Sequence, residues 1–143
     1  GMNDREIKQQ VAKLSNVEHR LELIKRGNMD ILDDSYNSNP VSSKYAIDTL
    51  NEFKGTKIIV TPGLIELGKD EKKYNEELGS YAEKYCDYIY LVNSTKSQFV
   101  ENGIKNKEKM VKVNSPQEAI QKITAMNYKK VCVLLENDLP DNY

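Results

Sequence analysis

The sequence predicts an α/β fold: a mostly parallel sheet of about six strands, one of them antiparallel, with helices covering both faces. Three observations lead to this prediction. Short apolar runs, typical of buried strands, alternate with stretches whose apolar residues recur at helical spacing. A tight-turn signal, Arg26-Gly27-Asn28, comes before the first of these repeats. The chain has 143 residues, which is the usual size of a single domain, and we expect one domain over residues 1–143.

The first part of the chain is expected to hold a helix and a β-hairpin. Residues 3–14 place apolar side chains on one helical face, behind polar residues suited to a helix start. Residues 19–25 alternate between apolar and charged side chains, and residues 29–33 follow across the turn. The two segments therefore predict a hairpin, whose first arm runs antiparallel to the rest of the sheet. A loop rich in turn and cap residues follows over residues 35–40.

Beyond this loop, helices and strands alternate regularly. The run Ile58-Ile59-Val60 is typical of a strand buried on both faces. Ser115, Pro116 and Glu118 give the clearest helix start, because they supply a cap, a proline at the first helical position and an acid three residues after the cap. We expect helices over residues 41–53, 70–85, 95–104 and 115–126, and strands over residues 56–61, 87–92, 110–113 and 130–135.

Composition and charge exclude several classes of protein. The chain carries 21 Lys and Arg against 22 Asp and Glu, and this balance argues against nucleic acid or an anionic membrane surface as the main partner. The longest apolar runs have five residues, whereas a membrane-spanning helix needs about 20, so no membrane insertion is expected. Residues 1–15 are too polar for a signal peptide, which favours the cytoplasm. Gly1, before Met2, is interpreted as a remnant of tag cleavage.

Cysteine and histidine are scarce. Cys86 and Cys132 lie 46 positions apart, and we expect both to be buried thiols in a reducing compartment, with a disulfide or a reactive thiol as the alternative. His19 is the single histidine. One histidine and two separated cysteines do not make a transition-metal site, so no such site is predicted.

The segment Gly63 to Asp70 nearly matches the phosphate-binding loop G-x-x-x-x-G-K-[ST]. Asp70 stands where a hydroxyl must hold Mg²⁺, and the interior Leu-Ile-Glu-Leu is bulky where a phosphate cradle needs small residues. We therefore interpret the segment as a structured loop whose apolar side chains anchor it to the core.

Ligands of open α/β sheets lie beyond the carboxyl ends of the strands, and the segment from Asp33 to Pro40 is the most unusual one predicted at that edge. A carboxylate there can accept both hydroxyls of a ribose, and the following helix start adds a positive dipole. Asx-turn and helix-cap chemistry is the competing explanation. Similarly, Arg20 could bind a phosphate through its planar fork, or could pair on the surface with Glu18 or Glu22.

Three segments carry a family resemblance. They are Val17-Glu18-His19-Arg20-Leu21-Glu22, then Leu32-Asp33-Asp34-Ser35-Tyr36-Asn37-Ser38-Asn39-Pro40, and Thr61-Pro62-Gly63-Leu64-Ile65-Glu66-Leu67-Gly68. Together they resemble the C-terminal domain of the Mur ligases, the ATP-dependent amide ligases of peptidoglycan synthesis. The second segment is specific and looks most like members that add D-alanyl-D-alanine to UDP-N-acetylmuramoyl-tripeptide. The resemblance covers nearly the whole chain.

The resemblance implies a Rossmann-like, three-layer domain of a cytoplasmic enzyme with two further domains. In this family ATP phosphorylates a substrate carboxylate, and the amine of the incoming substrate attacks the acyl phosphate. The central domain, absent here, holds the phosphate loop, the Mg²⁺ ligands and a modified lysine. The C-terminal domain closes over ATP and helps to place the amine substrate.

The resemblance also implies roles for particular residues. Arg20 would meet the γ-phosphate during catalysis, and Asp34 would contact the ribose of ATP. Tyr36, Asn37 and Asn39 would line the nucleotide and substrate side of their loop. Without the N-terminal and central domains, the chain alone is expected to be inactive.

One departure from the family pattern leaves the amine substrate open. The loop after the third predicted strand begins Thr61-Pro62-Gly63, where many D-alanyl-D-alanine-adding enzymes carry a Gly-Asp pair. Two alternatives therefore stand beside the main interpretation. The chain could belong to a Mur ligase homologue with a different amine substrate, or it could be a stand-alone Rossmann-like binding module.

Overall fold

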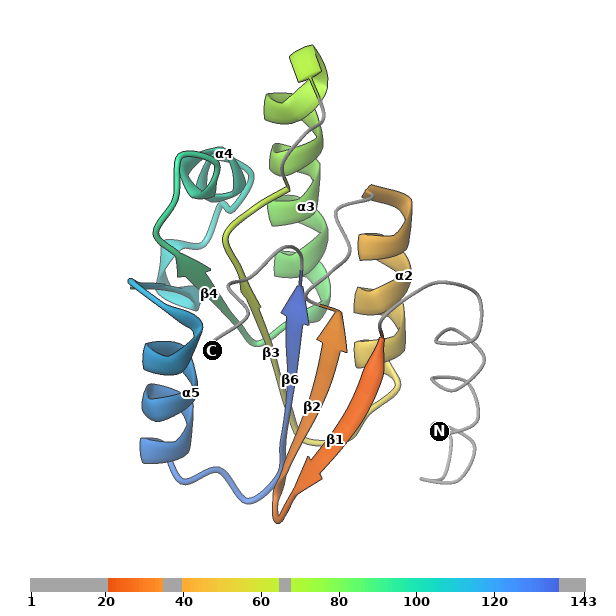
Figure 1. Ribbon diagram of the computed structural model, residues 1–143, viewed down its shortest axis with the longest axis vertical. Helices are drawn as coiled ribbons and strands as arrows, with labels where there is room; N and C mark the ends of the chain where they lie inside the picture. Colours follow the sequence, from red (N-terminus) through yellow and green to blue (C-terminus); the bar gives the residue numbers. More distant parts are fainter. Residues whose placement is uncertain (1–20, 35–39, 65–67, 137–143) are drawn as a thin grey trace.

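In the computed structural model, which describes residues 21–34, 40–64 and 68–136, a six-stranded sheet forms the centre of the domain (Figure 1). The strands are β1 (Glu22–Arg26), β2 (Met29–Asp34), β3 (Thr56–Thr61), β4 (Tyr88–Val92), β5 (Met110–Val113) and β6 (Val131–Glu136). Their order across the sheet is β1-β2-β6-β3-β4-β5. Only the β1–β2 pair is antiparallel, and the four other neighbouring pairs are parallel. The predicted fold class, including its antiparallel first strand, is confirmed.

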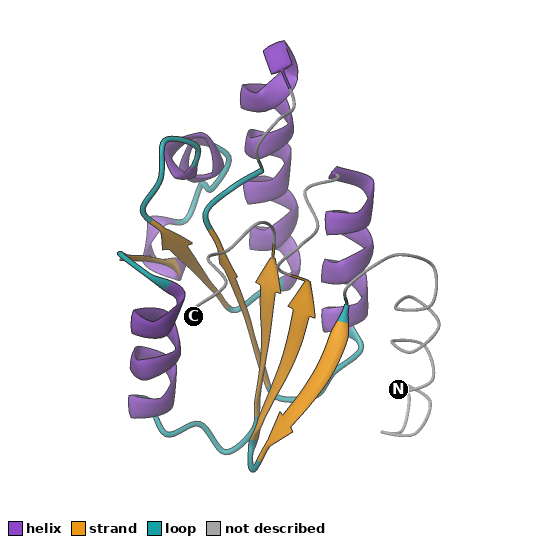
Figure 2. Cartoon of the chain, in the orientation of Figure 1, coloured by secondary structure: helices purple, strands orange, loops and turns teal. Residues whose placement is uncertain are grey.

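Helices cover the two faces of the sheet unequally (Figure 2). They are α2 (Pro40–Asn51), α3 (Glu71–Tyr85), α4 (Ser97–Asn102) and α5 (Pro116–Ala125), with short 3-10 turns at Gly68–Asp70 and Lys107–Lys109. The larger core cluster packs α2, α3 and α4 against one face, through residues such as Leu50, Leu78 and Val100. The smaller cluster packs α5 against the other face, through Ala119 and Ile123. The predicted three layers are therefore present.

The strand β6 is the buried centre of the sheet. All six of its residues are buried, because it has a strand on either side and helices on both faces. Cys132 on this strand and Cys86 after α3 are free and buried, as predicted. Burial raises the pKa of the Cys86 thiol to about 12 and that of Cys132 as well, so neither is a reactive thiolate at neutral pH. Within the described ranges, no helix is long and apolar enough to cross a bilayer.

Several element boundaries differ from those predicted. The hairpin turn is limited to Gly27 and Asn28, and Gly27 takes a φ of 60°, which glycine adopts without strain. The helix predicted over residues 41–53 runs from Pro40 to Asn51. The helix predicted over residues 95–104 begins only at Ser97, because the Ser94 hydroxyl accepts the Ser97 N–H at 3.1 Å and caps the chain there. The helix predicted over residues 3–14 lies outside the described residues.

The start of α5 is as predicted. Ser115 caps the helix by accepting the Glu118 N–H at 3.1 Å, and Pro116 follows as the first helical residue. The Glu118 carboxylate in turn accepts the Asn114 N–H at 2.9 Å. These local contacts satisfy backbone donors that the helix itself leaves unpaired.

Helices α3 and α4 approach each other through two glycines. A Cβ atom on Gly79 would lie 2.1 Å from the carbonyl oxygen of Val100, and one on Gly103 would lie 2.0 Å from that of Glu76. Both distances are far shorter than any real Cβ contact, so only glycine allows the two backbones to come this close. This packing fixes α4 beside α3, at the carboxyl end of β4 (Figure 1).

Candidate functional site

Three polar side chains lie side by side where β2, β6 and β3 end. Asp34 and Glu136 are partners in the β2–β6 register, and Thr61 is the residue after the Val60–Leu135 pair of β3 and β6. Residues two positions earlier on these strands belong to the core cluster under α2 and α3. Since side chains alternate along a strand, all three polar side chains point to that same face. The carboxyl edge that the sequence analysis singled out therefore carries a polar row.

The two acids of this row are buried together. Asp34 is 2% exposed and Glu136 is fully buried. The hydroxyl of Ser43, from α2, donates a hydrogen bond to Glu136 Oε1 at 2.7 Å. The pKa of Glu136 is raised well above its usual value, mainly by burial. The neighbouring Asp34 carboxyl group is the second cause. Burial and the neighbouring carboxyl group thus favour the protonated form of Glu136.

The loop after β3 is held by Asn75, which is fully buried on α3. Asn75 Oδ1 accepts the Leu64 N–H at 2.6 Å, and Asn75 Nδ2 donates to the carbonyl oxygens of Leu64 at 3.0 Å and Glu71 at 2.8 Å. Gly63, with a φ of 97°, makes the tight turn, and Leu64 is fully buried. The described part of this loop is anchored to the core, as expected for a structured loop and not for a phosphate cradle.

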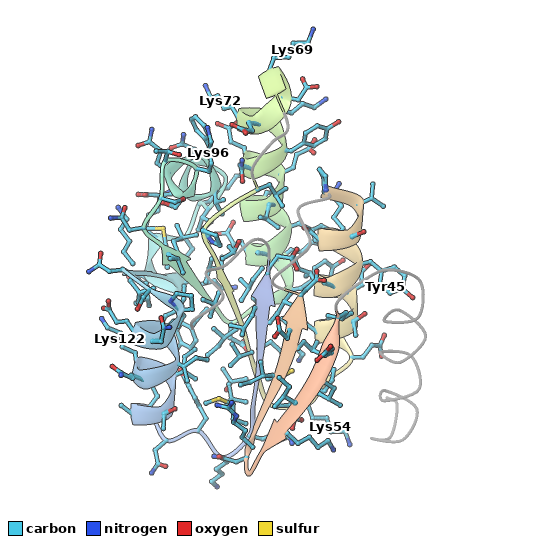
Figure 3. All side chains as sticks on the ribbon, viewed as in Figure 1. Tyr45, Lys54, Lys69, Lys72, Lys96 and Lys122 are labelled. Atoms are coloured by element: carbon cyan, nitrogen blue, oxygen red, sulfur yellow. The ribbon has the colours of Figure 1, made fainter. Side chains whose placement is uncertain are left out.

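The loop after β4 is tied to the loop after β3. The Ser94 hydroxyl donates to the Pro62 carbonyl oxygen at 2.5 Å. Lys96 forms an ion pair with Glu71 of α3 at 2.6 Å. Figure 3 places Lys96, Lys69 and Lys72 at the end of the molecule toward which β6 and β2 point. The carboxyl ends of β3 and β4 and the start of α3 therefore form one connected edge.

Two hollows lie beside this edge. The larger, of about 290 Å³, is on the α5 face and is lined by Ile24, Arg26, Ile31, Asp33, Pro116, Gln117, Ile120, Gln121 and Leu135. The smaller, of about 190 Å³, lies over the β4 end and is lined by Leu91, Asn93, Ser94, Ser97, Gln98, Glu101 and Lys112. Alternation along β2 thus sends Asp33 to the larger hollow and Asp34 to the opposite face.

The structure describes one of the five predicted site residues. Asp34 lies at the predicted strand end, but it is almost fully buried and interacts with Glu136. Arg20, Tyr36, Asn37 and Asn39 lie outside the described residues. Within the described ranges, no group of three or more His, Cys, Asp or Glu residues could hold a metal ion.

Sequence reasoning did not select Glu136, Ser43 or Asn75 as site residues. An acid directly after the apolar run Val131 to Leu135 was a usable signal, because it follows a predicted strand at the carboxyl edge of the sheet. No local pattern marked Ser43 or Asn75. Both lie on helices, and their side chains form hydrogen bonds with a strand or a loop elsewhere in the chain.

Comparisons with known proteins point to one family. A family model described as "Mur ligase, glutamate ligase domain" matches residues 19–135. The chain is 40% identical over 67 residues to a UDP-N-acetylmuramoyl-tripeptide--D-alanyl-D-alanine ligase of Buchnera aphidicola, a match over 46% of this chain and 15% of that protein. It is 31% identical over 94 residues to the Bacillus subtilis protein of the same name, over 63% and 21% of the two chains.

A solved structure agrees with these sequence matches. The MurF ligase of Thermotoga maritima, in complex with ADP, superposes with a TM-score of 0.73 at 25% identity, over 83% of this chain and 27% of that one. The present chain thus spans about a quarter or less of the length of the relatives that it matches.

Proposed function

Because the chain belongs to the Mur ligase family, we propose that it acts as the C-terminal domain of an ATP-dependent ligase that adds D-alanyl-D-alanine to UDP-N-acetylmuramoyl-tripeptide. The observation that carries the proposal is the family match over residues 19–135, which spans every strand except the last residue of β6. The two curated relatives, both named for this reaction, support the choice of substrates.

In this proposal the chain's own part is to bind the nucleotide and place the amine, while other domains do the phosphoryl chemistry. In this proposal Mg²⁺ would be held by the central domain. Arg20 would meet the γ-phosphate, and Tyr36, Asn37 and Asn39 would line the nucleotide and substrate side of their loop. The UDP-linked muramoyl peptide would be held mainly by the N-terminal and central domains, in the cytoplasm.

Asp34 is the residue that this proposal assigns to the ribose of ATP. A carboxylate can accept both ribose hydroxyls, and the ends of β2 and β6 place it at the edge where α/β sheets bind ligands. Asp34 is only 2% exposed, so contact with a ribose requires its carboxylate to become more accessible.

The amine substrate is the least determined part of the proposal. The segment Thr61-Pro62-Gly63 departs from the Gly-Asp pair noted above, and its geometry is fixed by the Asn75 and Ser94 contacts. A homologue that uses another amine would share the same fold. The assay below therefore compares amines.

Two experiments test the proposal: the gene is sequenced upstream of this chain, and the full-length protein that it encodes is assayed. An upstream segment in phase with this chain that encodes G-x-x-G-K-[ST] is expected. The complete product should then release phosphate from ATP when given UDP-N-acetylmuramoyl-tripeptide with D-alanyl-D-alanine, and less with L-alanyl-L-alanine or with single amino acids. A stop codon directly upstream of Met2 would favour the stand-alone binding module instead.

The chain alone is expected to hydrolyse no ATP. Phosphoryl transfer depends on positioned Mg²⁺ and phosphate contacts, and no group of metal ligands occurs among the described residues. Phosphate release by the purified 143-residue chain should equal that of a mock purification from cells without the gene. Steady turnover above that control, retained through a second chromatography step, would contradict this prediction.

Nucleotide binding by the chain alone is expected to be weak. A few charge-assisted hydrogen bonds contribute roughly 1.5–3 kcal/mol each, whereas association costs about 4–15 kcal/mol. The dissociation constant for ATP should therefore be about millimolar or weaker, measured by NMR titration. Asp34→Ala should weaken binding further, while Asp87→Asn, an exposed acid at the opposite edge of the sheet, should not. A micromolar constant would indicate a complete site and favour the stand-alone module.

A further inference from the structure

Glu136 is a buried ionisable group that the proposed function leaves unexplained. It ends the central strand, is fully buried, and lies beside the nearly buried Asp34 on the neighbouring strand. Its Oε1 atom accepts the Ser43 hydroxyl at 2.7 Å. Its Oε2 atom is buried and receives no hydrogen bond from any N–H or O–H donor in the part of the chain that the structure describes.

Two ionised carboxylates cannot be stable in this arrangement. Each would lack water, and each would repel the other across one strand spacing. Ser43 has one hydroxyl hydrogen, and it is already directed at Oε1. A proton on Oε2 removes the difficulty, because a protonated carboxyl group is a donor and Asp34 is the acceptor next to it. The Asp34 side chain is close enough to raise the pKa of Glu136.

We propose that Glu136 stays protonated at neutral pH and donates a hydrogen bond from Oε2 to Asp34, so that the two carboxyl groups share one proton and one negative charge. Glu136 is then a positioning residue, which holds the Asp34 carboxylate at the edge of the sheet. The consequence for nucleotide binding rests on the proposed function, in which Asp34 accepts the ribose hydroxyls. The shared proton itself does not depend on it.

The surroundings of Glu136 agree with this assignment. Its neighbours are Asp34 on β2, which is titratable, the Ser43 hydroxyl on α2, and Thr61 at the end of β3. Thr61 Oγ1 already accepts the Gly63 N–H at 3.1 Å. Among the described residues, no lysine or arginine contributes to the pKa of Glu136, whose shift upward is caused by burial and then by Asp34.

The test compares the pH dependence of stability in the wild-type chain and in Glu136→Gln. The glutamine amide can donate to Asp34 and accept from Ser43, but it cannot ionise. A carboxyl group with a raised pKa in the folded state stabilises most below its unfolded pKa of about 4.3, and this stability is lost as pH rises toward the folded pKa. In urea titrations, the wild-type unfolding constant, divided by that of Glu136→Gln, should therefore rise about tenfold per pH unit above pH 4.3 until the folded-state pKa of Glu136 is reached.

Matched controls separate this effect from the loss of any one glutamate. Glu52→Gln, an exposed residue just after α2, should follow the wild-type pH profile. Asp34→Asn removes the neighbouring charge, so it should lower the pKa of Glu136. The rise of the unfolding constant with pH should then end at a lower pH than in the wild type. Parallel profiles for wild type and Glu136→Gln would overturn the proposal.

A spectroscopic measurement keeps the proposal testable if Glu136→Gln does not fold. In wild-type chain labelled with ¹³C at glutamate carboxyl groups, one signal should stay in its protonated position at pH 7. Titration of every glutamate signal near its ordinary pKa would overturn the shared proton.

Nucleotide binding gives an independent readout of the positioning role. Glu136→Gln should bind ADP as the wild type does, whereas Glu136→Ala, which loses the donor, should bind several-fold more weakly in NMR titrations. Equal ADP binding by Glu136→Ala would overturn the positioning role. If the wild-type chain binds no ADP at all, the ribose role of Asp34 fails, while the pH profiles still decide the shared proton.

Discussion

Replacing Asn75 by leucine is expected to lower the free energy of unfolding by about 3 kcal/mol, because it leaves two buried backbone groups of the loop after β3 without partners. Asn75 pairs with both the N–H and the carbonyl oxygen of Leu64, and both residues are fully buried. Each buried polar group left unpaired costs roughly 1–3 kcal/mol. Leucine has the same number and branching of side-chain heavy atoms, so it leaves no cavity.

The measurement combines urea unfolding with hydrogen exchange. The Leu64 amide should exchange much faster in Asn75→Leu, since its hydrogen bond to Asn75 Oδ1, at 2.6 Å, is lost. Amides of β4 should be affected only as far as global stability falls. Asn51→Leu, at the exposed end of α2, is the matched control and should change stability by less than about 0.5 kcal/mol. Wild-type protection of Leu64 in Asn75→Leu would show that another group holds the loop.

Gly79→Ala is expected to destabilise the domain by about 3 kcal/mol, although the same change in an exposed helix stabilises by roughly 0.5–1 kcal/mol. The added Cβ atom would lie 2.1 Å from the Val100 carbonyl oxygen, and a backbone atom of a packed helix cannot simply move aside. Helix α4 must therefore shift away from α3, and the core contacts of Val100 and Ile104 loosen with it. The opposite sign from ordinary helix propensity makes the result diagnostic.

Thermal unfolding measures this change directly. At 2–4 °C per kcal/mol for a domain of this size, the midpoint should fall on the order of 10 °C. Ser80→Ala, the exposed neighbour on the same helix, is the control and should leave the midpoint nearly unchanged. An unchanged or higher midpoint for Gly79→Ala would mean that the two helices pack less closely than described.

Features that depend on neighbouring residues could be predicted from the sequence. The order of strands and helices follows from apolar periodicity, and the start of α5 follows from Ser115 and its partners. The hairpin required β1 to be antiparallel to β2, because two strands joined by a two-residue turn must run in opposite directions. The family was also indicated by sequence, since three segments of its pattern are present.

The candidate site could be predicted only in part. The carboxyl edge and Asp34 were indicated by the motif between Asp33 and Pro40, whereas the burial of Asp34 was not. Contacts such as that of Asn75 with Leu64 join a helix to a loop and leave no periodic signal in either. The roles of Arg20, Asp34, Tyr36, Asn37 and Asn39 stay predictions.

Local periodicity, caps and motifs were enough to predict the described strands and helices, their order and the family. No local signal indicated that the last strand, β6, enters the middle of the sheet between β2 and β3. That insertion places Glu136 beside Asp34 and beneath Ser43, although these residues are about a hundred positions apart in the chain. The physical reason is that strand pairing between distant segments is chosen by the packing of the whole core, which no local pattern records.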